Sequence, residues 1–272
     1  MKLAGRRVAA MVVACALAAL AVAAVGAPWV ARDAAHTETP APQDSSLPGT
    51  APLPEARCPG PGAPPVNRVP VGPVLSVQQL VLTTADGVNL AAVRVGGGER
   101  GVVLVHGDRG NLCTWWSFAR RLAAKGFHVL AFDLRCYGFS ECGRRRDYVA
   151  DTVAAVTALR HAGAKRVALA GTALGANIAL VTAAHREVTT GGVVAVSPVD
   201  LNTPVTDGTA NSTVAQAAPR LGVPLLVCVG DAPAADLASL AAGVGNRQLV
   251  TGVNIGDDAL AAQVTDFLTA RT

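Results

Sequence analysis

A strand, a glycine-flanked turn and a helix follow one another between residues 166 and 181, and this unit constrains the fold more than any other part of the chain. The apolar run of residues 166–170, RVALA, is typical of a buried strand. Gly171-Thr172-Ala173-Leu174-Gly175 follows it and leads into a helix-like run. The two glycines indicate a sharp, crowded turn that leaves space only for small groups beside Ala173. The unit predicts a strand that feeds directly into a helix.

Other apolar runs continue this alternation. Residues 79–83 and 88–95 flank Asp86-Gly87, which is a hairpin signal. Hairpin strands followed by alternating strands and helices predict an α/β fold with a doubly wound, mostly parallel sheet and an N-terminal β-hairpin. One domain, residues 76–272, accommodates them all. Further strands are predicted at 101–106, 128–133, 166–170, 192–197, 223–229 and 248–253, and helices at 115–125, 148–161, 176–181, 234–242 and 258–270.

The N-terminus has the pattern of an export signal or a membrane anchor. Lys2, Arg6 and Arg7 precede an uncharged stretch of 24 residues, and about 20 apolar residues suffice to span a bilayer. We expect residues 1–31 to be either a cleaved signal peptide or a membrane anchor. Because basic residues stay on the cytoplasmic side, both alternatives place the domain on the extracytoplasmic side, secreted or membrane-anchored.

A proline-rich segment separates this leader from the domain. Between Pro28 and Pro73 lie 12 of the 17 prolines, so residues 32–75 are predicted to be a linker. Without the three leader cations, the chain has 20 basic against 19 acidic residues. This near-neutral balance argues against a nucleic-acid partner.

Three segments in this order make the domain resemble the α/β-hydrolases. They are the run VLVHG at 103–107, the run VLAFDLR at 129–135 with Gly138 and Ser140 after it, and the turn at 171–175. The last has the frame of the Gly-x-Ser-x-Gly nucleophile elbow. The resemblance covers nearly all of 76–272 and implies a small hydrolase core. Only about 25 residues separate the strands predicted at 192–197 and 223–229, so a large lid is not expected.

The resemblance implies a Ser, an acid and a His in that chain order, and each position is altered. Ala173 stands at the nucleophile position, and a methyl group cannot attack a carbonyl. The acid position falls in Val229-Gly230-Asp231-Ala232-Pro233, where Asp231 is the best candidate; a turn or helix-cap role is its equal alternative. Ile255 stands at the position of the base, and all five histidines lie at or before His185. We therefore expect no intact triad.

The backbone part of such a site does not depend on side chains. The resemblance implies that oxyanion donors are the amide of Leu174 and one amide near Asp108 or Arg109. Gly171 and Gly175 are expected to maintain the elbow. A pocket able to hold a carbonyl or a small anion is the consequence.

Cysteine positions fit an oxidising compartment. Cys136 and Cys142 are six residues apart, which favours a local disulfide, and Cys58 with Cys113 is a second candidate pair. Cys228 lies in an apolar run and is predicted to be a buried free thiol. The spacing of Cys and His residues suggests no metal site, and we expect no cofactor.

Two functions are open at this point. In the first, the chain is an exported, non-catalytic pseudo-hydrolase that binds a small ligand or a protein and meets the membrane only through its N-terminal segment. In the second, it is an atypical serine esterase or amidase that uses Asp231 and a displaced nucleophile such as Ser140 or Ser197. Turn or cap roles are the plainer interpretation of both serines.

Overall fold

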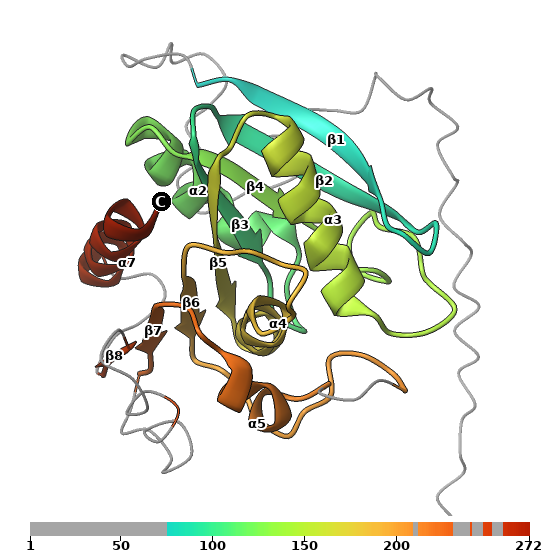
Figure 1. Ribbon diagram of the computed structural model, residues 1–272. Helices are drawn as coiled ribbons and strands as arrows, with labels where there is room; N and C mark the ends of the chain where they lie inside the picture. Colours follow the sequence, from blue (N-terminus) through green and yellow to red (C-terminus); the bar gives the residue numbers. More distant parts are fainter. Residues whose placement is uncertain (1–74, 209–211, 231–239, 241–246, 252–257) are drawn as a thin grey trace, which may run out of the picture. The chain divides into compact units, whose positions relative to one another are not determined.

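The computed structural model describes residues 75–208, 212–230, 240, 247–251 and 258–272. The leader, nearly all of the predicted linker, most of the helix predicted at 234–242 and the loops that contain Asp231 and Ile255 lie outside these residues. Strands and helices alternate along the described chain after a first β-hairpin (Figure 1). The strands are β1 Val77–Thr83, β2 Asn89–Gly96, β3 Arg100–Val105, β4 His128–Phe132, β5 Arg166–Thr172, β6 Val193–Val196, β7 Leu225–Cys228 and β8 Arg247–Val250.

Helices connect the parallel strands. The longer ones are α2 Trp116–Ala124, α3 Tyr148–His161, α4 Leu174–Ala183 and α7 Asp258–Arg271. The short ones are the 3-10 turn η1 Leu112–Trp115, α5 Val214–Ala217 and the 3-10 turn η2 Ala218–Arg220. Only α5 and η2 lie in the described part of the β6–β7 connection, so a large lid is absent from that part.

All described strands join in one sheet in the order β1-β2-β4-β3-β5-β6-β7-β8. β1 pairs with β2, and β2 with β4, in antiparallel register, whereas every pair from β4 to β8 is parallel. This arrangement confirms the predicted doubly wound sheet with its N-terminal hairpin. The carboxyl ends of the parallel strands meet at one edge, where ligands of such sheets bind.

Side-chain alternation along the strands divides the core into two layers. Val103 and Val105 of β3 pack in the cluster that contains α3 and α4, whereas Val102 and Leu104 pack in the cluster that contains α2 and α7. Helices therefore cover both faces of the sheet (Figure 1). Burial on both faces explains why these strands are continuous apolar runs.

Several element boundaries differ from the expected ones, and polar side chains explain them. The helix expected from Trp115 begins at Trp116, because the Asn111 side chain accepts a hydrogen bond from the Cys113 amide and caps η1. The hairpin turn extends to Val88, whose amide donates to the Thr84 hydroxyl at 2.9 Å. These local bonds compete with regular secondary structure.

Candidate functional site at the carboxyl edge of the sheet

The elbow between β5 and α4 retains its sharp geometry although alanine occupies its apex. Ala173 has φ 49° and ψ −122°, a conformation that L-residues seldom adopt. A Cβ at Gly171 would clash with the backbone of Gly175, and one at Gly175 would clash with the carbonyl oxygens of Val105 and His106. Both glycines are therefore needed for backbone-to-backbone contact between the strands and the helix. The side chain of Ala173 is only partly buried.

The turn after β3 lies directly beside the elbow. A Cβ placed on Gly107 would come within 3.1 Å of the Ala173 methyl carbon. The turn closes through a hydrogen bond from the Gly110 amide to the Gly107 carbonyl at 3.1 Å, and it exposes Asp108 and Arg109. Within the described residues, the backbone amides of Asp108 and Arg109 donate no hydrogen bond. Leu174 is the first residue of α4, so its amide has no acceptor inside the helix.

His106 is a structural residue of this turn. Its side chain is fully buried, its Nδ1 lies 2.7 Å from the Gly107 carbonyl oxygen, and its Nε2 accepts the Leu134 amide at 3.0 Å. Burial lowers the pKa of His106 below its ordinary value of 6.5. The ring is neutral, with Nδ1–H as donor and Nε2 as acceptor. Since both nitrogens are occupied by backbone groups, His106 is not available as a general base.

Asp133 connects the loops that follow β3 and β4. Its Oδ1 accepts the Leu112 amide at 2.7 Å and its Oδ2 accepts the Phe139 amide at 2.9 Å. The hydroxyl of Ser140 donates to the Asp133 carbonyl at 2.6 Å and accepts the Ala91 amide at 2.9 Å. This serine, a candidate displaced nucleophile, therefore has a structural role.

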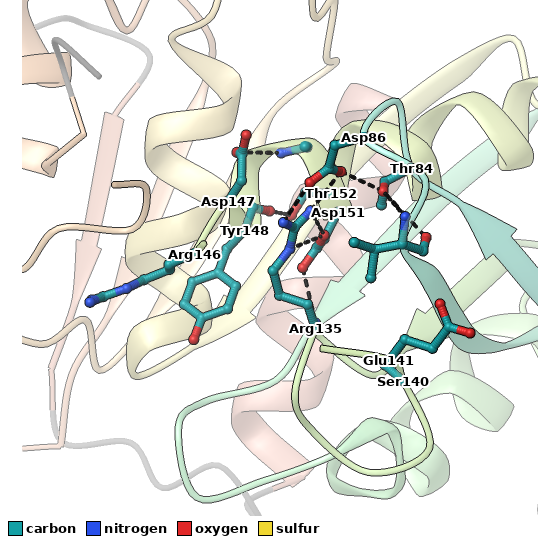
Figure 2. A network of polar contacts seen from close by, with 12 residues as sticks. Thr84, Asp86, Arg135, Ser140, Glu141, Arg146, Asp147, Tyr148, Asp151 and Thr152 are labelled. Carbon is teal, nitrogen blue, oxygen red and sulfur yellow. Dashed lines mark hydrogen bonds and ion pairs between the residues drawn. The ribbon is translucent and has the colours of Figure 1, made fainter. Parts of the chain in front are cut away.

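A buried arginine anchors the loop after β4 to the hairpin and to α3. Arg135 pairs with Asp86 at 2.9 Å and with Asp151 at 2.7 Å, and Figure 2 shows its guanidinium between the two carboxylates. It also donates to the Arg145 carbonyl at 3.0 Å. Hydrogen bonds from Arg135 lower the pKa of Asp86 to about 2. The network positions the loop and lies outside the elbow.

Tyrosine side chains lie on the β4 side of the site. The ring of Tyr137 contacts His106 edge-on, with a centroid distance of 5.2 Å, and also contacts Tyr148 at 6.3 Å. Burial raises the pKa of Tyr148 to about 12, so its hydroxyl remains protonated near neutral pH. Both rings are half-buried.

Asn177 is a positioning residue that the sequence analysis missed. Its fully buried amide donates to the Asp200 carbonyl at 3.0 Å and accepts the Val199 amide at 3.1 Å. It thereby holds the segment after β6 against α4. The signal available in the sequence is one asparagine inside an otherwise apolar helical run, four residues after Ala173.

The cysteines occupy three different environments. Cys136 and Cys142 form a disulfide in the loop after β4. Cys113 is also disulfide-bonded, while Cys58, its expected partner, lies outside the described residues. Cys228 is free and buried, as predicted. Within the described part of the chain, no cluster of three or more Cys, His, Asp or Glu residues could hold a metal ion.

Fold, strand order and elbow together define the class of protein: the chain has the α/β-hydrolase fold, as its motifs predicted. A family model described as serine aminopeptidase, S33, matches residues 99–223, from just before β3 to just before β7. No curated protein matches the chain in sequence.

Solved structures give the same result. An esterase from Pyrococcus furiosus has a TM-score of 0.60 at 19% identity, covering 72% of this chain and 91% of the esterase. An α/β hydrolase from Penicillium has a TM-score of 0.60 at 16% identity, covering 72% and 99%. One from Sphaerobacter thermophilus has a TM-score of 0.54 at 20% identity, covering 69% and 99%. At these identities the similarity concerns the fold.

Proposed function

We propose that the chain is a non-catalytic α/β-hydrolase-fold protein that binds a small carbonyl-containing ligand, or a protein that presents such a group, at the elbow. The observation that carries this proposal is an elbow whose strained backbone is intact around an alanine. A residue held in a sparsely populated backbone region of this kind costs roughly 1–3 kcal/mol. Such a conformation persists only where the surrounding structure holds it.

The chemistry that remains is hydrogen-bond donation to oxygen. The turn that contains Gly107 lies against the Ala173 methyl group, and Leu174 opens α4 directly after it. Backbone amides that converge on one point in this way bind a carbonyl oxygen, and this is the role proposed for them. Alanine at the apex supplies no nucleophile. The two ring nitrogens of His106, the residue after β3, are both engaged by backbone groups. Binding without turnover is what this set of groups supports.

We also propose that the domain functions outside the cytoplasm. The basic start and the long uncharged run of residues 8–31 support this location, and so does the Cys136–Cys142 disulfide. Among the described residues, no helix has both the length and the apolarity to cross a membrane.

Labelling of the purified protein with a fluorophosphonate, together with turnover of p-nitrophenyl acyl esters, tests the non-catalytic proposal. We expect neither a covalent adduct nor ester hydrolysis above the rate in buffer. A stoichiometric adduct on one serine, with matching turnover, would show that the alternative, an esterase or amidase with a displaced nucleophile, is correct. Mass-spectrometric mapping of the adduct would then identify the nucleophile, with Ser140 and Ser197 as the first positions to inspect.

A further inference from the structure

Ser197 stands beside the apex of the elbow, directly after the neighbouring strand β6. Thr172 of β5 and Val196 of β6 are partners in the parallel register, and the Ala173 amide donates to the Val196 carbonyl at 3.0 Å. Neighbouring strands lie about 4.8 Å apart. Ala173 follows Thr172 and Ser197 follows Val196, so these two residues also lie side by side. A Cβ on Gly107 would lie 3.1 Å from the Ala173 methyl carbon on the other side, so the three residues form one row just beyond the ends of β3, β5 and β6.

The backbone of Ser197 is held in an unfavourable conformation. Its φ is 46°, in the left-handed region, and it precedes Pro198, which favours extended backbone in the residue before it. Its amide donates to the Cys228 carbonyl at 2.7 Å. Among the described residues, three other than glycine have positive φ, namely Cys136, Ala173 and Ser197, and each follows a parallel strand at this edge. Strain of this kind clusters at binding and active sites.

The helix that begins at the elbow also fixes the position of Ser197. Asn177, one turn into α4, holds the backbone of Val199 and Asp200 on both its donor and its acceptor side. Ser197 is thus tied to the apex through the sheet and through α4. A donor fixed in this way loses little conformational entropy when a ligand binds.

The hydroxyl of Ser197 remains available. The residue is exposed, and within the described part of the chain its side chain makes no hydrogen bond. Ser140, the other serine considered as a nucleophile, uses its hydroxyl as both donor and acceptor inside the protein. Of the two serines considered as nucleophiles, Ser197 is therefore the one whose hydroxyl is not used inside the described part of the protein.

We propose that Ser197 is a ligand-contacting residue that determines specificity for a carbonyl group: its hydroxyl donates a hydrogen bond to the oxygen that the amides of Leu174 and of the 107–110 turn also face. This role rests on the proposed function. It involves no covalent step, because a serine without a base is a hydrogen-bond donor and a poor nucleophile. Ser197 thus supplies a hydroxyl from β6 where the apex has only a methyl group.

Titration of the purified protein with butyramide and with butyrate, followed by the amide NMR signals of Leu174 and Gly107, tests this role. We expect both signals to shift, and Ser197→Ala to raise the Kd about threefold to tenfold, the range for loss of one neutral hydrogen bond. Ser197→Gly, which removes the hydroxyl without requiring strain, is expected to weaken binding equally. Ser117→Ala, an exposed serine on α2, is the matched control and should bind as the unaltered protein does.

Each other outcome has a defined meaning. Equal Kd values for Ser197→Ala and the unaltered protein would overturn the role of Ser197 and leave the proposed binding site standing. No shift of Leu174 with either probe would overturn both. A fluorophosphonate adduct on Ser197 would replace its donor role with that of a nucleophile.

Discussion

Single residues explain how the elbow keeps the backbone geometry of a hydrolase site around an alanine. Ala173 keeps the dihedral angles of the elbow, because Gly171 and Gly175 permit contact that any other residue would prevent. His106 keeps the neighbouring turn in place and has no nitrogen left for proton transfer. The backbone geometry of the elbow therefore does not depend on a serine at its apex, because close packing of the flanking glycines maintains it.

Restoring one side chain is not expected to restore activity. Ala173→Ser places a hydroxyl at the apex, but the final 87 residues of the chain contain no histidine to act as its base. We expect p-nitrophenyl ester turnover to stay at the level of the unaltered protein, measured by nitrophenolate release under identical conditions. Turnover well above that level would show that another group of the protein serves as the base.

The neutral state of His106 predicts a pH dependence of stability. Its folded-state pKa lies below 6.5, so the unfolded chain binds the proton more readily. The stabilisation is complete above about pH 6.5 and is lost as the pH falls below that value, where the unfolded imidazole becomes protonated. We expect the urea midpoint to fall between pH 7.5 and pH 5.5, and to fall less in His106→Gln.

The two proteins are compared by the slope of the urea midpoint with pH, because His106→Gln is also expected to lower the stability of the fold through lost hydrogen bonds. His128, whose pKa burial also lowers, contributes equally in both proteins. Identical slopes would contradict the assignment of this pH dependence to His106.

At the scale of elements, buried polar side chains decide how the loops of the site are placed. Asp133 connects the loops after β3 and β4, Asn177 connects α4 to the segment after β6, and Arg135 connects the loop after β4 to the hairpin and α3 (Figure 2). Each of them joins segments that are distant in sequence. The strands and most helices follow from apolar periodicity, but these connections have no periodic signal.

The Arg135 network predicts a large difference between two ion pairs. Arg135→Met leaves the fully buried carboxylate of Asp151 without its cation and should lower the free energy of unfolding by about 3–5 kcal/mol. Arg146→Met is the control, because both members of its pair with Asp207 are nearly half exposed, and it should cost at most about 1 kcal/mol. Urea denaturation measures both; equal losses would contradict a structural role for the buried network.

At the scale of the whole molecule, the oxidation state of the cysteines tests the proposed extracytoplasmic location. We expect Cys136 and Cys142 to resist alkylation in denaturant until a reductant is added, because they are joined. Cys228 should resist alkylation in the native protein and react on unfolding, because burial raises the pKa of its thiol to about 12. Mass spectrometry of alkylated peptides measures all three.

Reaction of Cys136 and Cys142 in the denatured, unreduced protein isolated from its source cells would contradict the proposed extracytoplasmic location. Alkylation of Cys228 in the folded protein at the same rate as in denaturant would contradict its burial. Cys228 therefore serves as an internal control for unfolding in the same sample.

By itself, the sequence determined the strand and helix order, the parallel sheet and the elbow with alanine at its apex. These are local properties. Each can be recognised from a short run of consecutive residues, whether an apolar run, a flanking glycine or the alanine at position 173. The tertiary structure alone decided that Gly107, Ala173 and Ser197 form one row. It also decided that the Ser140 hydroxyl is hydrogen-bonded within the protein, and that Asn177 holds the residues that follow Ser197. Those facts depend on strand register and on contacts across the sheet, and register is a property of paired strands that neither strand carries alone.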